Sequence, residues 1–440
     1  MTTTPWLEEG IACARHVAAA ASWSGDACTW RAADAPTALG GDFYEGTAGI
    51  AWALARSAAI AGDASVRRAA VGAARHALIW AATTPFRPGF HDGTLGALWA
   101  VADASAAVGA GDLLEQATAS VERAIASLEA PASGAAVGAG GFDLIHGMAG
   151  SLLALVAASD LPCRSPDLVA AVRRLQARVQ LTAEPAELGL RWPAKPLPDG
   201  TPGPALGLAH GASGAALALL EAARLTGDSA AASTAFDGFL FERASFDARI
   251  CSWRDPVTGA PLASSWCNGT TGMVLARLRA LELRGDPAIA SEVGAALAGL
   301  HRSVVALGQD RSWASANCSL CHGLLGTADA LWSAGDALDH PAHRGAAESV
   351  ASYAVWLARR LGRWPCGTID GATSYGLMLG LAGVAATLLR LHAPSGMPPP
   401  GLPTWIRITP RHGSHWCSYG PDTEAVTLRP GSRNRSQRVR

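Results

Sequence analysis

The sequence carries little charge for its length. Asp, Glu, Lys and Arg make up 16% of its 440 residues, and the formal net charge is -1. A chain this close to neutral has no general electrostatic attraction for nucleic acid or for an anionic membrane. Neither is therefore expected as a partner, and any charge-driven contact must be local.

Export and membrane signals are also missing. The N-terminus, Met1 to Glu9, has neither the basic region nor the apolar run of a signal peptide. Apolar stretches elsewhere are broken by Arg, Asp, Glu or Gly before they reach the roughly 18 to 20 residues of a membrane-spanning helix. The nine cysteines are scattered and odd in number, a poor match to a disulfide framework. The sequence predicts a cytoplasmic protein without a membrane span.

What the chain does have is an internal repeat. A Gly-x-x-Gly motif followed by small apolar residues occurs seven times, at intervals of 47 to 64 residues. A fixed repeat of this length is typical of architectures built from one supersecondary unit used many times. The copies are Gly46-Gly49, Gly93-Gly96, Gly147-Gly150, Gly211-Gly214, Gly269-Gly272, Gly323-Gly326 and Gly380-Gly383.

The residues after each motif predict a helix. Runs such as 48–54 and 213–220 are apolar on nearly all faces, which indicates buried helices, whereas runs between the motifs, such as 65–80 and 287–305, are amphipathic. Seven inner and seven outer helices that alternate in sequence can close into a double ring. We therefore predict an all-α fold, an (α/α)7 toroid, whose glycines allow positive φ and close backbone approach where the helix N-termini converge.

The toroid is expected to fill residues 1–394. After that point the composition changes to Pro398-Pro399-Pro400 and then to an arginine-rich end. Residues 395–440 are therefore predicted to be a largely disordered C-terminal tail, although Trp405 and Trp416 leave room for a docked segment.

Two of the motifs carry residues that suit a metal. Cys321 and His322 stand directly before Gly323, and Cys267 has the same place relative to Gly269 as Cys321 has to Gly323. Thiolate and imidazole are ligands that zinc prefers, and three protein ligands leave a fourth position for water or substrate. We predict a zinc site made by Cys267, Cys321 and His322. The alternatives are buried structural cysteines, or Cys318 as a ligand.

Further polar residues precede the other motifs. His210 can serve as a general acid or base near neutral pH, and Asp143 could orient its imidazole, although either could instead cap a helix. A row of polar residues at one buried end is not what packing alone selects. The remaining candidates for a substrate cavity are His146, His91, Asp92 and Asn268.

These motifs together resemble a known family, the lanthionine synthetase C-like cyclases, and most closely the C-terminal cyclase domain of class II lanthipeptide synthetases. The resemblance covers residues 40–392, and the combination of a Cys, a Cys-His pair and seven glycine motifs is specific. His146 and Asn268 depart from the family pattern. The phrases that carry the resemblance are Ala209 to Gly214, Phe241 to Asp247, Ser265 to Gly269, Ser319 to Gly323 and Gly376 to Gly383.

The resemblance implies the fold, the cofactor and the reaction. It implies an (α/α)7 toroid in which zinc is held by Cys267, Cys321 and His322, while His210 and Asp143 handle protons. The activity implied is the addition of a peptide cysteine to dehydroalanine or dehydrobutyrine, which forms a (methyl)lanthionine thioether ring. The expected partner is a dehydrated precursor peptide with a leader. Since no dehydratase region precedes the first repeat, a separate dehydratase is expected to supply it.

Three other functions fit part of the sequence. The chain could be a non-catalytic, zinc-containing scaffold that binds peptides. It could add a different thiol, such as glutathione, to dehydroamino acids. It could also be an (α/α) barrel glycosidase, with Asp92 and Asp143 as its pair of carboxylates.

Overall fold

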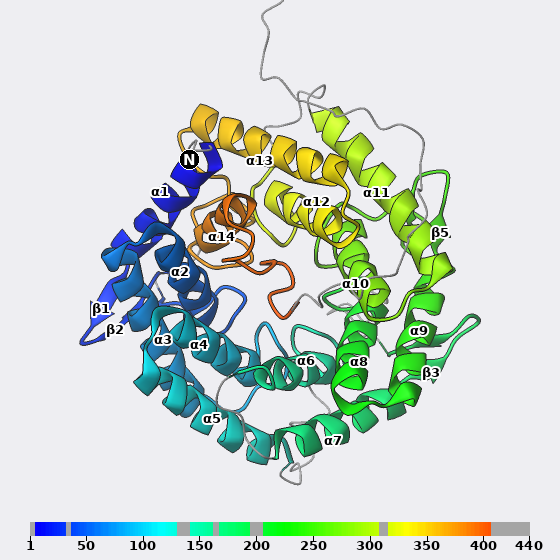
Figure 1. The fold of residues 1–440 in the computed structure, drawn as a ribbon, viewed down its shortest axis with the longest axis horizontal. Coiled ribbons are helices and arrows are strands. Elements are labelled where there is room, and N and C mark those ends of the chain that lie inside the picture. Colours follow the sequence, from blue (N-terminus) through cyan, green and yellow to red (C-terminus); the bar gives the residue numbers. More distant parts are fainter. Residues whose placement is uncertain are drawn as a thin grey trace, which may run out of the picture.

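Two concentric rings of helices make up the protein. The computed structural model describes residues 5–31, 37–129, 141–161, 167–193, 206–307 and 316–405. The inner ring contains α2 (Thr47–Ala61), α4 (Thr94–Val108), α6 (Met148–Ala158), α8 (Ala212–Thr226), α10 (Thr270–Leu283), α12 (Leu324–Ala337) and α14 (Leu381–His392) (Figure 1). The outer ring contains α1 (Pro5–Ala19), α3 (Ala64–Thr83), α5 (Gly111–Glu129), α7 (Leu168–Leu181), α9 (Ser229–Arg243), α11 (Pro287–Leu307) and α13 (Pro341–Leu361). The predicted all-α (α/α)7 toroid is confirmed.

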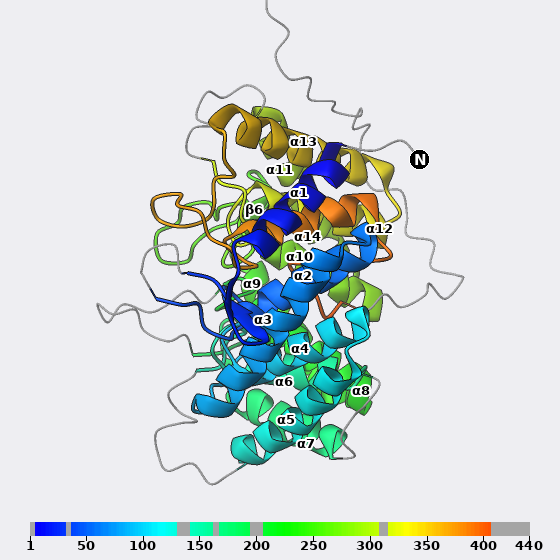
Figure 2. The same cartoon turned by 90° about the vertical axis from the view of Figure 1, so that its left-hand side faces the viewer.

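The N-terminal helix closes the outer ring. Six outer helices follow an inner helix in the sequence, but the last inner helix, α14, packs against α1 from the other end of the chain. Seen from the side, α1 to α5 follow one another along the near wall of the ring (Figure 2). The seventh repeat is therefore assembled from the two ends of the described chain.

The burial pattern explains why each helix has its place. All residues of α6 except Met148 are buried, as expected for a helix surrounded on all sides. In α7 only one stripe is buried, and the remaining face is open to solvent. The residues of that stripe are Leu168, Ala171, Val172, Leu175, Gln176 and Val179.

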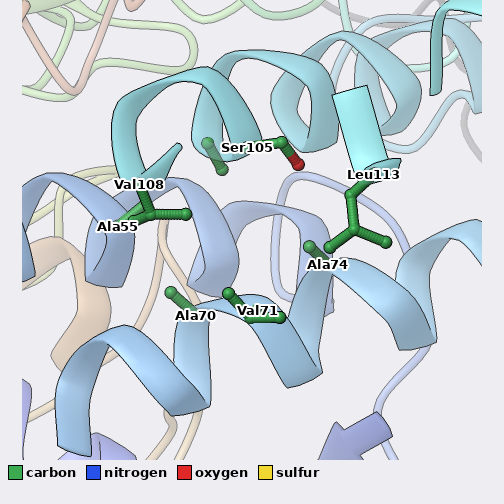
Figure 3. Close-up of a pocket in the computed structure, with 8 residues that line it drawn as sticks. Ala55, Ala70, Val71, Ala74, Ser105, Val108 and Leu113 are labelled. Atoms are coloured by element: carbon green, nitrogen blue, oxygen red, sulfur yellow. The ribbon is translucent and has the colours of Figure 1, made fainter. Parts of the chain in front are cut away.

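The space between the two rings is closely packed. A small gap between α2, α3, α4 and α5 is lined by small and aliphatic side chains, half of them alanines, and has no room for a water molecule (Figure 3). None of the helices in the described residues is long and apolar enough to cross a lipid bilayer. Three short antiparallel hairpins lie outside the rings: β1 (Ser22–Ser24) with β2 (Ala27–Thr29), β3 (Glu184–Pro185) with β4 (Leu190–Arg191), and β5 (Phe246–Asp247) with β6 (Ser252–Trp253).

The repeated glycines serve close packing. The second glycine of every motif lies against the carbonyl oxygen of the residue six positions earlier, where a Cβ would come within 1.8 to 2.2 Å of that oxygen. None of the motif glycines has positive φ, so that part of the prediction is wrong. The loop must fold back onto the first turn of its inner helix, and only the absence of a side chain permits this.

We expect Gly96→Ala to destabilise the ring by roughly 1–3 kcal/mol, because its Cβ would overlap the carbonyl oxygen of Phe90 at 1.8 Å. Chemical denaturation followed by circular dichroism measures the change. Gly294→Ala is the matched control, since this exposed glycine inside α11 has open space around it and should gain stability instead. Equal effects of the two substitutions would contradict the packing argument.

The seven motif loops are joined to one another at one end of the toroid by backbone hydrogen bonds. Each loop donates to the next, and the last loop donates back to the first, so the series is closed. The amide groups of the turns are thereby satisfied without regular sheet. In order, the bonds run from Tyr44 to His91 (3.0 Å), Phe90 to Leu144 (2.9 Å), Leu144 to Ala209 (3.0 Å), Ala209 to Cys267 (2.7 Å), Trp266 to Cys321 (2.7 Å), Cys321 to Met378 (3.0 Å) and Met378 to Tyr44 (2.9 Å).

The segment after α14 runs towards the middle of the ring (Figure 1). Met397, Leu402 and Trp405 are buried there. The amide of Gly401 donates to Asp329 Oδ2 at 2.9 Å, and its carbonyl oxygen accepts from Trp266 Nε1 at 2.6 Å. The start of the region predicted as a tail, 395–405, thus packs against the helices. The rest of that region, including Trp416, lies outside the described residues.

Candidate active site at the centre of the loop ring

A cavity of about 230 Å³ opens among the motif loops. Its walls combine a thiol, two imidazoles, a carboxylate, a phenol and an indole with two aliphatic side chains. They come from the first five repeats, whose loops are adjacent because of the hydrogen bonds described above. The lining residues are Tyr44, Asp92, Ile145, His146, Ala209, His210, Trp266 and Cys267.

Cys267 and Cys321 form a hydrogen-bonded pair of thiols. The hydrogen bond from Cys321 lowers the pKa of Cys267 to about 5, although burial opposes this shift. The same bond and burial raise the pKa of Cys321. Tyr44 Oη lies 3.0 Å from Cys321 Sγ and donates to it. Cys267 is thus disposed to be a thiolate, the form in which cysteine binds metals.

The imidazole of His322 is fixed by the backbone. Its Nε2 lies 3.1 Å from the carbonyl oxygen of Gly367. Because a carbonyl oxygen can only accept, Nε2 carries the proton and the lone pair lies on Nδ1. Metal-binding histidines commonly have their second ring nitrogen held in this way.

The donor types at this end of the cavity fit zinc. Two thiols in contact, one of them favouring the thiolate, and an imidazole with a defined lone pair form a set that zinc prefers. Among the described residues, no three or more His, Cys, Asp or Glu side chains are grouped so that they could hold a metal ion. The fit to zinc thus lies in the chemistry of the donors, and the ligand assignment stays a prediction.

The alternative ligand Cys318 has different neighbours. It is fully buried, and burial raises its pKa, as do the nearby thiols of Cys366 and Cys13. The structure thus groups Cys318 with Cys13 and Cys366.

His210 lines the cavity and forms a hydrogen-bonded pair with Asp143. His210 Nδ1 lies 2.9 Å from Asp143 Oδ2, and the His210 side chain is 33% exposed against 10% for that of Asp143. The other carboxylate oxygen, Oδ1, accepts from the backbone amide of His146 at 2.7 Å. Asp143 thereby holds the ring of His210 in one orientation through Nδ1, and Nε2 is the nitrogen that this carboxylate does not engage.

A second pair of the same kind lies beside the first. His146 Nδ1 is 3.0 Å from Asp92 Oδ2, and Arg87 is 3.9 Å from the same oxygen. Burial alone would raise the pKa of Asp92, but the hydrogen bond and charge of His146 outweigh it and hold the pKa below its usual value. The rings of His146 and His210 stack at 5.6 Å between centroids.

The other two predicted cavity residues, His91 and Asn268, are not among the side chains that line the cavity. His91 is buried, and burial lowers its pKa to about 3, so the ring is neutral. Its edge meets Trp266 with 4.8 Å between ring centroids. Within the described residues, neither ring nitrogen of His91 nor Oδ1 of Asn268 has a hydrogen-bond partner.

The sequence analysis missed Tyr44. It lines the cavity and holds the thiol of Cys321, and burial followed by the charge of Cys321 raises its pKa. The signal was present, because Tyr44 stands two residues before the first glycine of its motif, as Cys267 and Cys321 do. Trp266 also lines the cavity without having been singled out.

Comparisons with known proteins agree with this architecture. A family described as "Lanthionine synthetase C-like protein" matches residues 37–401. Solved structures that resemble the chain include one titled "Nisin cyclase", with a TM-score of 0.63 and 14% sequence identity over 90% of this chain and 96% of that one. A search among curated proteins finds no match.

Proposed function

The chain belongs to the lanthionine synthetase C-like family, and from this premise we propose that it is a zinc-dependent peptide cyclase. It adds a cysteine thiol of a ribosomally made peptide to a dehydroalanine or dehydrobutyrine of the same peptide, which gives a thioether ring. The observation that carries the proposal is that Cys267 and His210 line one cavity, with Cys321 hydrogen-bonded to the first and Asp143 to the second. The activity needs both a site for sulfur and a proton donor.

Cys267, Cys321 and His322 would hold the zinc ion. When bound, zinc favours the ionised form of a substrate thiol and so supplies a nucleophile at neutral pH. Tyr44 fixes Cys321 through its hydrogen bond, and Gly367 fixes the ring of His322. These contacts set the ligands in place before substrate binds.

His210 supplies the proton that completes the addition. When sulfur bonds to Cβ, the electron pair of the double bond moves towards Cα and the adjacent carbonyl, and Cα then takes a proton. The bond to Asp143 leaves Nε2 of His210 as the proton-carrying atom that faces the cavity, and the carboxylate stabilises the imidazolium. Trp266 and Ile145 form an apolar part of the wall of the same cavity.

The substrate class follows from the reaction. The substrate would be a precursor peptide in which serine or threonine has already been dehydrated, with a leader segment attached, and a separate dehydratase would provide it. The solved structure named nisin cyclase agrees with this class by its title alone. In a glycosidase the carboxylates would act on sugar, whereas Asp92 and Asp143 each hold a histidine here.

The test is a cyclisation assay. Zinc-loaded protein is incubated with model peptides that each contain one dehydroalanine and one cysteine, followed by thiol alkylation and mass spectrometry. Cyclisation leaves the peptide mass unchanged and removes the alkylatable thiol. Tight peptide binding with no loss of thiol would favour the scaffold. Loss of thiol only when glutathione is also present, with glutathione added to the peptide, would favour intermolecular addition.

His210→Gln is expected to lower the cyclisation rate by about 100- to 10,000-fold, because glutamine keeps a side chain of similar size but cannot deliver a proton. Initial rates from the alkylation assay give the effect, and zinc content measured on the same preparation should be unchanged. A variant that keeps the wild-type rate and zinc content would remove His210 from the mechanism.

A further inference from the structure

We propose that Trp266 determines which dehydroamino acid the protein accepts. Its indole limits the room beside Cβ and so favours dehydroalanine over dehydrobutyrine, which carries an additional methyl group on that atom. This rests on the proposed function and narrows its substrate class. The observations behind it are the place of Trp266 in the cavity wall and the contacts that hold its indole still.

Trp266 lies beside both groups that are proposed to act on the dehydroamino acid. It directly precedes Cys267, and Ala209 directly precedes His210. The amide of Ala209 donates to the carbonyl oxygen of Cys267 at 2.7 Å, so the two segments lie side by side. All four residues line the cavity. Trp266 and Ala209 are therefore wall residues next to the site for sulfur and next to the proton donor.

The addition brings Cβ close to these two wall residues. The sulfur comes from the side of Cys267, and the proton for Cα comes from His210. Since Cβ is bonded to both the sulfur and Cα in the product, its substituent lies between these two sides of the cavity. That substituent is a hydrogen in dehydroalanine and a methyl group in dehydrobutyrine. Ala209 contributes one methyl group to the wall, whereas Trp266 contributes a whole indole, so Trp266 sets the room.

The indole of Trp266 is held on several sides. Its Nε1 donates to the carbonyl oxygen of Gly401 at 2.6 Å. The rings of His91 and Trp266 are in edge contact, with 4.8 Å between their centroids. The backbone amide of Trp266 donates to the carbonyl oxygen of Cys321 at 2.7 Å. A side chain packed in this way cannot move aside for a methyl group without losing contacts.

The acceptor of the indole is itself anchored. Gly401 belongs to the segment after α14, which runs towards the middle of the ring (Figure 1). Its amide donates at 2.9 Å to Oδ2 of Asp329, a fully buried residue of α12. Further along the segment, Trp405 Nε1 donates to Oε2 of Glu282 on α10 at 2.5 Å. The segment after α14 thus supports one wall of the cavity.

Two pairs of model peptides test the proposal. The peptides of the first pair contain cysteine and either dehydroalanine or dehydrobutyrine, and the alkylation assay gives the ratio of their cyclisation rates. Those of the second pair lack cysteine, so they bind without reacting, and titration calorimetry gives the ratio of their dissociation constants. Comparing each ratio between variant and wild type cancels the different intrinsic reactivity of the two dehydroamino acids.

We expect wild-type protein to bind the dehydroalanine peptide more tightly. Trp266→Phe should shift both ratios towards dehydrobutyrine by about 10-fold or more, because one carbon more or less in an apolar pocket is worth about 10- to 200-fold. Gly401→Ala should shift them in the same direction by less. Its Cβ would come within 2.9 Å of Asp329 Oδ2, so the segment must move and the indole loses its acceptor.

The matched control is Trp332→Phe, which should shift neither ratio. Trp332 is a buried tryptophan of α12 that does not line the cavity, and its Nε1 has no hydrogen-bond partner in the part of the chain that the structure describes. Circular dichroism checks that every variant is folded. Should Trp266→Phe fail to fold, the ratios of Gly401→Ala decide.

Every other outcome contradicts the proposal. If Trp266→Phe slows both cysteine peptides equally, the indole has a structural role only, and the proposed function still stands. If it shifts the rate ratio but not the ratio of dissociation constants, the indole acts on the chemistry and not on the room beside Cβ. If Gly401→Ala shifts neither ratio, the indole needs no support from the segment after α14. If wild-type protein cyclises neither cysteine peptide, the proposed function itself is wrong.

Discussion

Cys321→Ala should yield a folded protein that contains no zinc and forms no thioether. Cys321 is both a proposed ligand and the hydrogen-bond donor that lowers the pKa of Cys267. The substitution therefore removes one thiol and weakens the thiolate character of the other. Loss of several kcal/mol of charge stabilisation corresponds to a rate decrease of about 1,000-fold or more. Tyr44 would also lose its sulfur partner.

Two measurements on one preparation check this. Elemental analysis gives zinc per chain, and the alkylation assay gives the cyclisation rate. Cys318→Ala is the matched control, because Cys318 is three residues away and buried but belongs to the cluster with Cys13 and Cys366. It should keep zinc and activity. A Cys321→Ala protein that retains stoichiometric zinc would show that the ligands lie elsewhere.

The architecture could be predicted because the same motif occurs seven times in the sequence. Each Gly-x-x-Gly motif indicates the same contact, in which a loop folds back on its helix. A signal that is weak in one copy therefore becomes decisive when it recurs. Of the two roles predicted for the glycines, close backbone approach is found and positive φ is not. The sequence indicates that no side chain fits at the motif glycines. Only the structure shows that the carbonyl oxygen six residues earlier excludes it and that φ is negative.

Two pairs of site residues could be predicted, His210 with Asp143 and the two cysteines that the repeat puts in register. Cys267 and Cys321 share a motif position, and the structure places them in contact. Tyr44 has that position too, but a tyrosine among buried helices is usually read as core. The contact of α1 with α14, and that of Gly401 with Trp266, join segments far apart in the chain and have no local signature.

Glu242→Ala is expected to destabilise the protein by about 3–5 kcal/mol, because it removes one of the carboxylates that pair with a buried arginine and leaves two backbone amides without their acceptor. Glu242 and Arg277 are both 0% exposed and lie 3.0 Å apart. Glu242 Oε1 also accepts from the amides of Gly207 and Ser213, both at 2.9 Å. The carboxylate thus joins α9 to α10 and to the start of α8.

The same network supports the candidate site. Gly207 begins the loop that carries His210, and its amide loses its acceptor when Glu242 becomes alanine. We therefore expect the rate of cyclisation to fall even under conditions where the variant is still folded. Denaturation by urea gives the free energy of unfolding, and Glu184→Ala is the control. Glu184 pairs with Arg191 at 3.4 Å on the surface, so its loss should cost less than about 1 kcal/mol.

Comparing Glu242→Gln with Glu242→Ala separates charge from hydrogen bonding. Glutamine retains an oxygen that can accept from Gly207 and Ser213, but among the described residues it leaves only Glu292, at 2.9 Å, to balance the charge of Arg277. If the charge pair dominates, the two variants lose similar stability. If the amide acceptors dominate, glutamine restores most of the stability and of the cyclisation rate, because the loop before His210 stays anchored. We expect glutamine to recover the rate more than the stability, since Arg277 is fully buried and the loop needs only an acceptor.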